Sequence, residues 1–410
     1  MGFRLLEVGK LRIALLAMTE PAGAGQPFPR AYLRVAGASL AQHQLGFALA
    51  FDCQRLICIA HGSSPDLIAL QHAAEDAGLQ FHVVSGARQL AGLVTANDEL
   101  LVISEGLFAD PASIEGLMSV RGAVVVVQPI EGALAAGFER IDLNRASAGL
   151  ARVPGALVER LQDLGPDCDA ASALTRLALQ SGARMAELPA TARLGAGWTL
   201  VRNETEALGV ETAWLRQQFG NSVSTAPGRA LSRFGVLAFG SSLLQAGNAS
   251  NTLGIGVLLV LGLGGVLGWF GFAWGGLVCA ALAWLFVEAI RKLRVAERHV
   301  TGTLPPAVPR ADLLGWIIDV VIAGLLLAAS PRYPGEPFLV WLAQPVVLML
   351  LAGLVARTIG GQLSEWIGDR LVLSLVLAGT AMFGLVDQAV MLLSIILLGV
   401  ALQFRPRVNG

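Results

Sequence analysis

The sequence predicts two parts of different fold class, an α/β domain followed by an all-α domain with six membrane spans. The 410 residues are 54% hydrophobic and only 14% charged, whereas charged residues make up about a quarter of a soluble domain. This shortage of charge is local, because Glu288 is the only charged side chain between residues 235 and 290. Residues 11–130 have an ordinary charge density and alternate short apolar runs with amphipathic stretches.

The α/β prediction depends on the apolar runs at residues 12–18, 55–60, 80–86, 99–106 and 122–129. The last run, GAVVVVQP, is continuously apolar, as expected of a strand that is covered on both faces. The rhythm of strands and helices indicates a mainly parallel sheet, which we assign to a domain of residues 1–145. Residues 146–229 are mostly helical in pattern and predict a cap and linker that lead to the membrane.

Six apolar runs after residue 250 are long enough to be membrane spans, which need about 20 residues each. They cover residues 252–271, 273–291, 312–330, 337–356, 371–386 and 388–404, in a membrane domain of residues 251–405. The last two runs are short, are separated by Asp387, and are also compatible with a helical hairpin. Residues 230–250 mix small, polar and apolar side chains, which favours a helix lying in the membrane interface.

The basic residues predict the orientation, because Lys and Arg are retained on the cytoplasmic side. They gather between spans two and three, between spans four and five, and after span six. We therefore expect a multi-pass protein of the bacterial inner membrane, in contact with membrane lipid, with both termini and the α/β domain in the cytoplasm.

Two acidic residues are predicted to lie inside spans, where a charge costs about 2.5–3.5 kcal/mol on insertion scales. Glu288 is near the end of span two and Asp319 is about two turns inside span three. Glu288 can extend to the membrane interface or pair with Arg291 or Lys292. Asp319 is either a packing contact between helices, as a hydrogen bond or ion pair, or part of a polar site. The basic cluster of Arg291, Arg294 and Arg298 is either a phosphate-binding group or an anchor to anionic lipid.

Composition excludes other functional classes. The net charge is −1, and no Lys/Arg-rich run indicates nucleic-acid binding. The four cysteines form no CxxC pair and the five histidines are scattered, so neither a zinc site nor a disulfide framework is expected. A small-solute transporter would need polar residues along several spans, and the later spans offer few.

Residues 11–130 resemble the nucleotidyltransferase fold of sugar-phosphate cytidylyl- and uridylyltransferases. The resemblance is carried by the glycine-containing loop Ala22–Gly25, the pair Pro29-Arg30 and the segment Val35-Ala-Gly37-Ala-Ser-Leu40. It implies that the loop backbone holds nucleotide phosphates and that Arg30, at the position of a family lysine, binds phosphate. It also places Glu105 at the strand end where the family has a metal-binding aspartate.

The membrane half resembles the CDP-alcohol phosphatidyltransferase family, on the basis of Asn251-Thr252 at the first span and of Gly315-x3-Asp319. The family binds two divalent metals through aspartates, so the resemblance implies that Asp319 and Glu288 bind Mg²⁺ or Mn²⁺, with Asp319 as the candidate catalytic residue. It also implies that Arg291, Arg294 and Arg298 bind the substrate, a CDP-alcohol or phosphoalcohol.

Together the two halves resemble the bifunctional enzymes that make CDP-inositol and then a phosphoinositol phospholipid. Ala323 stands where the family pattern has a further aspartate, and Glu288-Ala-Ile-Arg-Lys-Leu-Arg294 replaces its first half. The leading hypothesis is therefore a catalytically degenerate relative, a pseudoenzyme with a binding or regulatory role in phospholipid metabolism. The alternative is an active CDP-alcohol phosphotransferase with diverged metal ligands. A homodimer is left open.

Overall fold

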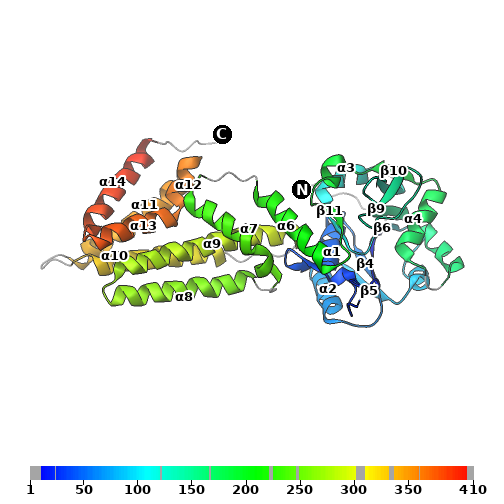
Figure 1. The fold of residues 1–410 in the computed structure, drawn as a ribbon, viewed down its shortest axis with the longest axis horizontal. Helices are drawn as coiled ribbons and strands as arrows, with labels where there is room; N and C mark the ends of the chain where they lie inside the picture. The colour runs from blue at the N-terminus through cyan, green and yellow to red at the C-terminus, as the bar shows by residue number, and fades with distance from the viewer. Residues whose placement is uncertain are drawn as a thin grey trace. The chain divides into compact units, whose positions relative to one another are not determined.

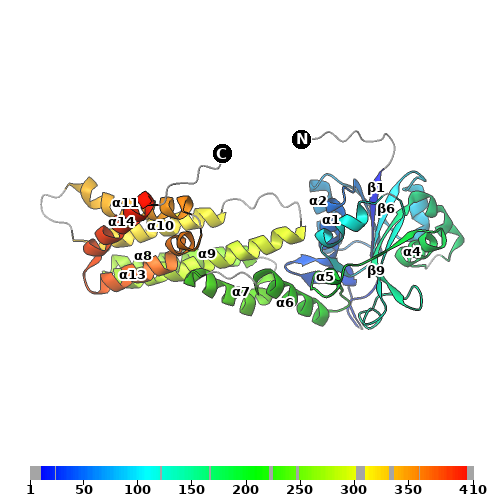
Figure 2. The same ribbon diagram turned by 90° about the horizontal axis from the view of Figure 1, so that it is seen from above.

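The computed structural model describes residues 11–403 apart from residues 24, 121, 166–167, 221–224, 246–248, 302–309, 332–336 and 360. Side chains are not described for residues 218–220, 239–245, 249–252, 295–301 and 310–311. The chain divides into an N-terminal unit, Met1–Gln217 with Glu297–Leu304, and a membrane unit, Gln218–Ala296 with Pro305–Gly410. Both are drawn in Figure 1 and, turned by 90°, in Figure 2.

The N-terminal unit is built on a seven-stranded sheet with the order β10-β8-β9-β6-β1-β4-β5. Neighbouring strands are parallel except where β9 pairs with β6 and β8. The strands are β1 (Arg12–Met18), β4 (Arg55–Ala60), β5 (Gln80–Val84), β6 (Glu99–Ile103), β8 (Val124–Pro129), β9 (Arg145–Pro154) and β10 (Arg184–Glu187). The prediction of an α/β domain with a parallel-rich sheet is confirmed.

Side chains alternate between the two faces of this sheet, and helices cover both faces. In β1, Ala14 and Leu16 belong to one core cluster and Ile13 and Leu15 to the other. The first cluster is closed by α1 (Leu40–Ala50) and α2 (Pro65–Asp76), and the second by α4 (Ala170–Gln180), as Figure 2 shows. Burial on both faces explains why the strands read as continuous apolar runs.

Strand β9 differs from the helical cap predicted for residues 146–229. Its ten residues lie inside the sheet, between β6 and β8. The segment RASAGLARVP is rich in Ala and has a Gly, so its local preference does not indicate a strand. Pairing with two neighbours at once determines its conformation. The helical pattern is present farther on, in α4 and in α6 (Glu204–Gly220).

Short elements complete the unit. A hairpin joins β2 (Arg34–Val35) to β3 (Ala38–Ser39), and β7 (Leu107–Ala109) pairs antiparallel with β11 (Trp198–Leu200). The remaining elements are α3 (Glu115–Met118), α5 (Ala190–Arg193) and the 3₁₀ turns η1 (Arg30–Tyr32), η2 (Ala87–Gly92), η3 (Pro111–Ile114), η4 (Gly155–Leu157) and η5 (Glu159–Asp163).

In its described residues the membrane unit is helical. Its helices are α7 (Pro227–Gln245), α8 (Ala249–Trp269), α9 (Ala273–Thr301), α10 (Arg310–Ala329), α11 (Phe338–Thr358), α12 (Gln362–Gly368), α13 (Arg370–Met382) and α14 (Val386–Gln403). Helix α7 covers most of the predicted interfacial segment 230–250, and its place in the membrane interface stays a prediction.

The prediction of six spans is wrong in number, because four described helices are long and apolar enough to cross a membrane. These are Ala273–Arg294, Asp312–Ala329, Phe338–Thr358 and Val386–Gln403. The predicted span 371–386 is cut short, since α13 ends at Met382 and Gly384 turns the chain with φ +69°. Its 13 residues rise about 20 Å, less than the ~30 Å of a bilayer core. In the predicted span 252–271, the apolar part of α8 whose side chains are described is Leu253–Trp269. It is also shorter than the other four helices.

Helix α9 is the central helix of the membrane unit. Of its span residues, 67% are buried within the unit, against 28% or less in α10, α11 and α14. Near the α8–α9 turn a Cβ at Gly276 would lie 2.6 Å from the carbonyl oxygen of Gly264 and 2.6 Å from Cδ2 of Leu325 on α10. Small residues therefore allow three helices to approach closely, which is the usual source of helix association in lipid.

We predict that Gly276→Ala destabilises the membrane unit by about 1–3 kcal/mol, because the new methyl group overpacks this contact. Unfolding of the full-length protein in detergent would measure the change. Gly256→Ala on α8 is the matched control, since a Cβ there meets nothing within 4 Å. Equal stability of the two variants would contradict the prediction.

Candidate functional site

A cavity of about 950 Å³ opens among α9, α10, α11, α12 and α13 of the membrane unit. One part of its wall is apolar and comes mainly from α10 and α11. The other part is charged and consists of Arg291, Asp312, Asp319, Arg357 and Arg370. The apolar lining includes Trp316, Val320, Ala323, Val346, Met349, Leu350 and Leu354. The cavity therefore combines a polar end with room for a hydrocarbon group.

Asp319 and Arg370 form a bidentate ion pair at the charged part of the cavity. Nε and Nη2 of Arg370 donate to the two carboxylate oxygens of Asp319 at 2.7 and 3.2 Å. Arg370 is buried, and its Nη1 also donates to the backbone oxygen of Ile367 at 3.2 Å. The pair joins α10 to the first residue of α13, and it uses both oxygens of the carboxylate.

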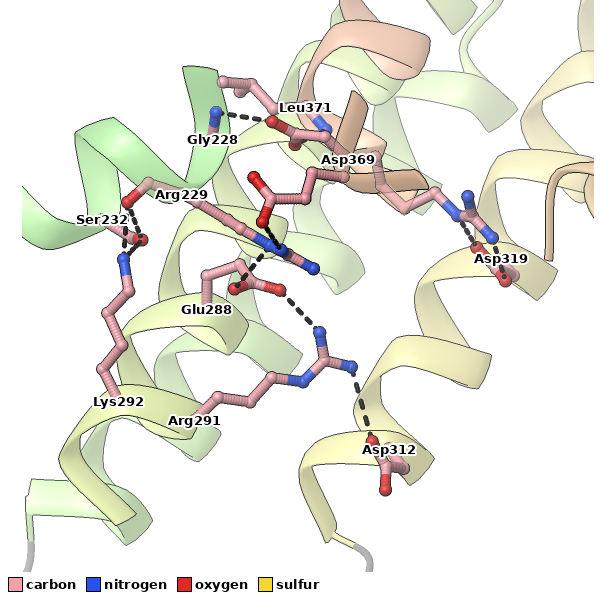
Figure 3. Close-up of polar contacts among 12 residues, drawn as sticks. Gly228, Arg229, Ser232, Glu288, Arg291, Lys292, Asp312, Asp319, Asp369 and Leu371 are labelled. Carbon is pink, nitrogen blue, oxygen red and sulfur yellow. Dashed lines mark hydrogen bonds and ion pairs between the residues drawn. The ribbon is translucent and has the colours of Figure 1, made fainter. Parts of the chain in front are cut away.

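Glu288 is buried beside the cavity and is also held by arginine, as Figure 3 shows. Its carboxylate accepts a hydrogen bond from Nη1 of Arg291 at 2.5 Å and lies 4.0 Å from Nε of Arg229 on α7. Arg291 reaches onward to Asp312 at 3.5 Å. Arg229 in turn pairs with Glu365 at 3.3 Å. These contacts connect α7, α9, α10 and α12.

Arg357 differs from the other two arginines of the cavity. It is exposed near the end of α11, and its guanidinium lies 5.9 Å from the ring centroid of Trp316. Among the described residues no carboxylate lies within 4.0 Å of it. Its positive charge is therefore available to a ligand in the cavity.

The structure brings some of the residues predicted from the sequence together and separates others. Asp319 and Arg291 line the same cavity, and Glu288 contacts Arg291 from outside it. Arg294 is half-buried on α9 and is not part of the lining. The side chain of Arg298 lies outside the described residues.

The carboxylates do not fit a two-metal centre as they are arranged. Both oxygens of Asp319 accept from Arg370, and Glu288 is engaged by two arginines. In the described part of the chain no group of three or more His, Cys, Asp or Glu side chains converges as a metal site. A divalent ion would have to displace guanidinium groups that already neutralise these carboxylates. We therefore derive no metal-dependent step.

Sequence reasoning missed Arg370 and Arg357 as site residues. In the sequence both are basic residues between predicted spans, and we used them only to predict the orientation in the membrane. Arg370 is 51 positions from Asp319, so nothing local connects them. One signal was present, since a carboxylate inside a span needs a partner and Arg370 is the basic residue directly before the predicted span 371–386.

Arg30, the other predicted substrate-binding residue, lies in the N-terminal unit beside Glu105. Arg30 forms an ion pair with Glu20. Oε2 of Glu105 accepts from the backbone nitrogens of Thr19 and Glu20 at 2.9 and 3.0 Å. Glu105 thus binds the amides that follow β1, at the start of the loop expected to hold phosphate. Burial raises the pKa of Glu105 to about 7, against the lowering effect of the two amides and of Arg30.

No protein-family model matches the chain, and no curated protein matches it in sequence. Solved structures match part of it. A glucose-1-phosphate thymidylyltransferase from Bacillus anthracis is 14% identical over 50% of this chain and 94% of that chain, with a TM-score of 0.39. A UDP-glucose pyrophosphorylase from Acinetobacter baumannii is 11% identical over the same shares, with a TM-score of 0.38. An inositol-1-phosphate CTP transferase from T. maritima is 13% identical over 44% of this chain and 86% of that chain, with a TM-score of 0.33.

The part of this chain that these structures match is its N-terminal half. The resemblance of the membrane unit to CDP-alcohol phosphatidyltransferases stays a prediction from the sequence.

We predict that Arg370→Leu destabilises the membrane unit by about 3–5 kcal/mol, because it leaves Asp319 half-buried without a counter-charge. The double variant Asp319→Leu/Arg370→Leu should recover most of this loss. Unfolding in detergent would measure the two single variants, Asp319→Leu and Arg370→Leu, and the double variant, with Arg357→Leu as a control that breaks no ion pair. If the loss in the double variant equals the sum of the losses in the two single variants, the direct pairing is contradicted.

We also predict that the N-terminal unit loses stability as the pH rises from about 4.5 to about 7. Burial raises the pKa of Glu105 and of Glu211 to about 7, so the folded state keeps protons that the unfolded chain releases above its ordinary pKa. The loss should be on the order of 1–3 kcal/mol per group. Calorimetric unfolding of the full chain across this pH range would show it. The pair of substitutions Glu105→Gln and Glu211→Gln should flatten the profile, and an unchanged slope would contradict this origin.

Proposed function

We propose that the membrane unit binds the phosphate group of a membrane lipid or lipid precursor in the α9–α13 cavity and does not transfer it. The observation that carries this proposal is Arg357, an arginine without a carboxylate partner in the described structure, at the polar part of a large apolar cavity. A planar guanidinium with several donors suits a phosphate oxygen in two-point contact.

The size and lining of the cavity support an amphiphilic ligand. Its volume of about 950 Å³ is at the upper end of the roughly 300–1,000 Å³ of ligand pockets. Acyl chains would lie against side chains such as Val320, Met349 and Leu350, and the headgroup would face Arg291 and Arg357. The charged and hydrocarbon parts of such a ligand would match the charged and apolar parts of the cavity wall.

The charge balance favours an anion. Arg370 is neutralised by Asp319, and Arg291 is shared between Glu288 and Asp312. The lining itself holds three arginines and two aspartates, so it has an excess of one positive charge, which favours a phosphate over a cation.

The paired state of Asp319 and Glu288 supports binding in preference to phosphotransfer. A CDP-alcohol phosphotransferase would need these carboxylates for metal, whereas here each one holds an arginine that links helices. A CDP-alcohol itself remains within the proposed ligand class, since it has both phosphate and lipid. The N-terminal unit, with its nucleotidyltransferase-like fold, would then serve binding or regulation.

The test uses the full-length protein in nanodiscs of phosphatidylcholine, with dioleoyl phosphatidic acid as the probe and dioleoylglycerol as its analogue without phosphate. Native mass spectrometry would count retained lipid. We expect retention of phosphatidic acid over dioleoylglycerol, and an affinity about tenfold lower in Arg357→Gln, the value of one charge-assisted contact.

Arg233→Gln is the matched control, because Arg233 belongs to the same unit and does not line the cavity. Equal retention of the two lipids, or an affinity unchanged by Arg357→Gln, would overturn the proposal. Release of CMP from CDP-diacylglycerol with Mg²⁺ or Mn²⁺, abolished by Asp319→Asn, would show that the unit is a working transferase.

A further inference from the structure

The turn that joins α8 to α9 exposes four large aromatic side chains. Trp269, Phe270, Phe272 and Trp274 are 89%, 71%, 53% and 44% exposed, and residues 269–274 include no charged side chain. Turns that face water are normally polar, and a contiguous exposed apolar surface indicates that something covers it. The turn does not line the cavity assigned to lipid phosphate, so its role is independent of the function proposed above.

The backbone of this turn has polar groups that do not fit the hydrocarbon core of a membrane. Gly271, at φ +85°, ends α8 in a Schellman motif, in which the N–H of Phe272 donates to the oxygen of Leu267 at 2.8 Å. The amides at the start of α9, residues 273–275, have no acceptor within the helix, and Phe272 before them has no polar side chain to cap them. Such groups need water or a lipid headgroup as a partner.

The turn between α13 and α14 has the same form. Gly384, at φ +69°, follows Phe383, and the N–H of Leu385 donates to the oxygen of Thr380 at 2.9 Å. The exposed large apolar side chains of this turn are Met382, Phe383 and Leu385. Asp387 follows two residues later, and its charge is costly in hydrocarbon. Two turns of the unit thus combine exposed apolar side chains with polar groups that need water.

Both turns lie at the end of the membrane unit where α10 ends, as Figure 1 and Figure 2 show. Leu325, close to the end of α10, lies beside Gly276 at the first turn. The indole N–H of Trp341 on α11 donates to the backbone oxygen of Ser330, directly after α10, at 3.4 Å. Phe338, which is exposed, has its ring centroid 5.9 Å from that of Trp341. A third aromatic group therefore belongs to the same end.

Helix α9 separates this aromatic end from basic residues by about the thickness of a bilayer. Its apolar part, Ala273–Arg294, has 22 residues and rises about 33 Å, close to the ~30 Å of a hydrocarbon core. Glu288 is the first charged side chain of α9, and Arg291, Lys292 and Arg294 follow it. With these basic residues at one surface of the bilayer, the aromatic end reaches the other surface.

We propose that the turns at residues 269–274 and 382–385 bind the interfacial layer of a lipid bilayer, at the level of the ester groups, and set the depth of the membrane unit. Aromatic rings and apolar side chains contact the upper parts of the acyl chains, and the indole N–H groups and free amides donate to lipid oxygens. Bulk water would leave the apolar side chains uncovered, and the hydrocarbon core would leave the amides without acceptors. The interface satisfies both.

The experiment is fluorine NMR on the full-length protein, labelled with fluorotryptophan, in nanodiscs of phosphatidylcholine. The signal of Trp269 is assigned by its loss in Trp269→Phe, which keeps an aromatic side chain. Line broadening is compared for lipids with a nitroxide on the headgroup, near the ester group or near the end of the acyl chain, and for a water-soluble gadolinium chelate. We expect the headgroup and ester-level nitroxides to broaden this signal roughly threefold more than the other two probes, because the indole lies in the interface.

Trp198, which is buried in the N-terminal unit, is the internal control, and the lipid nitroxides should leave its signal unchanged. Phe383→Trp adds a reporter to the second turn and should show the same pattern as Trp269. Strongest broadening by the gadolinium chelate would place the turns in water, and strongest broadening by the chain-end nitroxide would place them in the core. Weak broadening by all four probes would show that protein, such as a second copy of the chain, covers them. Each of these three results would overturn the proposal.

Discussion

Carboxylates buried among the helices of the membrane unit have to be neutralised, because an unpaired charge in a low-dielectric environment costs several kcal/mol. Two of them are paired with arginines. Asp319 on α10 binds Arg370 on α13, and Glu288 on α9 binds Arg291 of the same helix and lies 4.0 Å from Arg229 on α7. Asp369 accepts from the first turns of α7 and α13, at 2.6 and 3.0 Å. The position of α13, and with it one wall of the cavity, depends on these contacts.

The N-terminal unit uses both kinds of partner, since Glu99 is paired with Arg12 and Arg152 at 3.3 Å. Glu105 is held by two amides, and the buried Arg152 donates to the carbonyl oxygens of Met118 and Gly122. Backbone donors do not carry a full charge, so Glu105 keeps a raised pKa of about 7. A guanidinium, as at Asp319, neutralises the carboxylate as well as satisfying its hydrogen bonds.

The predictions that were successful depend on local sequence, and those that failed depend on contacts between distant residues. The α/β domain and the apolar helices follow from periodicity and from the distribution of charge, which are local. Strand β9 was missed because its Ala- and Gly-rich sequence becomes a strand only between β6 and β8. Helix α13 was predicted too long because hydropathy continues through Gly384, where the backbone turns. The pairing of Glu288 with Arg291 was among the alternatives because the two residues are three positions apart, whereas the partner of Asp319 was not predicted.

The sequence by itself determined that one half of the chain folds around a sheet and that the other half has helices apolar enough for lipid. Short apolar runs indicate buried strands, and long apolar runs with few charges indicate membrane helices. It also determined that Glu288 and Asp319 need neutralising groups. For Glu288 one such group, Arg291, is three residues away on the same helix. Only the tertiary structure decided the others, because Arg370 is 51 residues from Asp319 and Arg229 is on another helix than Glu288. Side chains distant in the sequence form ion pairs only when their helices pack side by side, and this packing depends on all the helices of the unit.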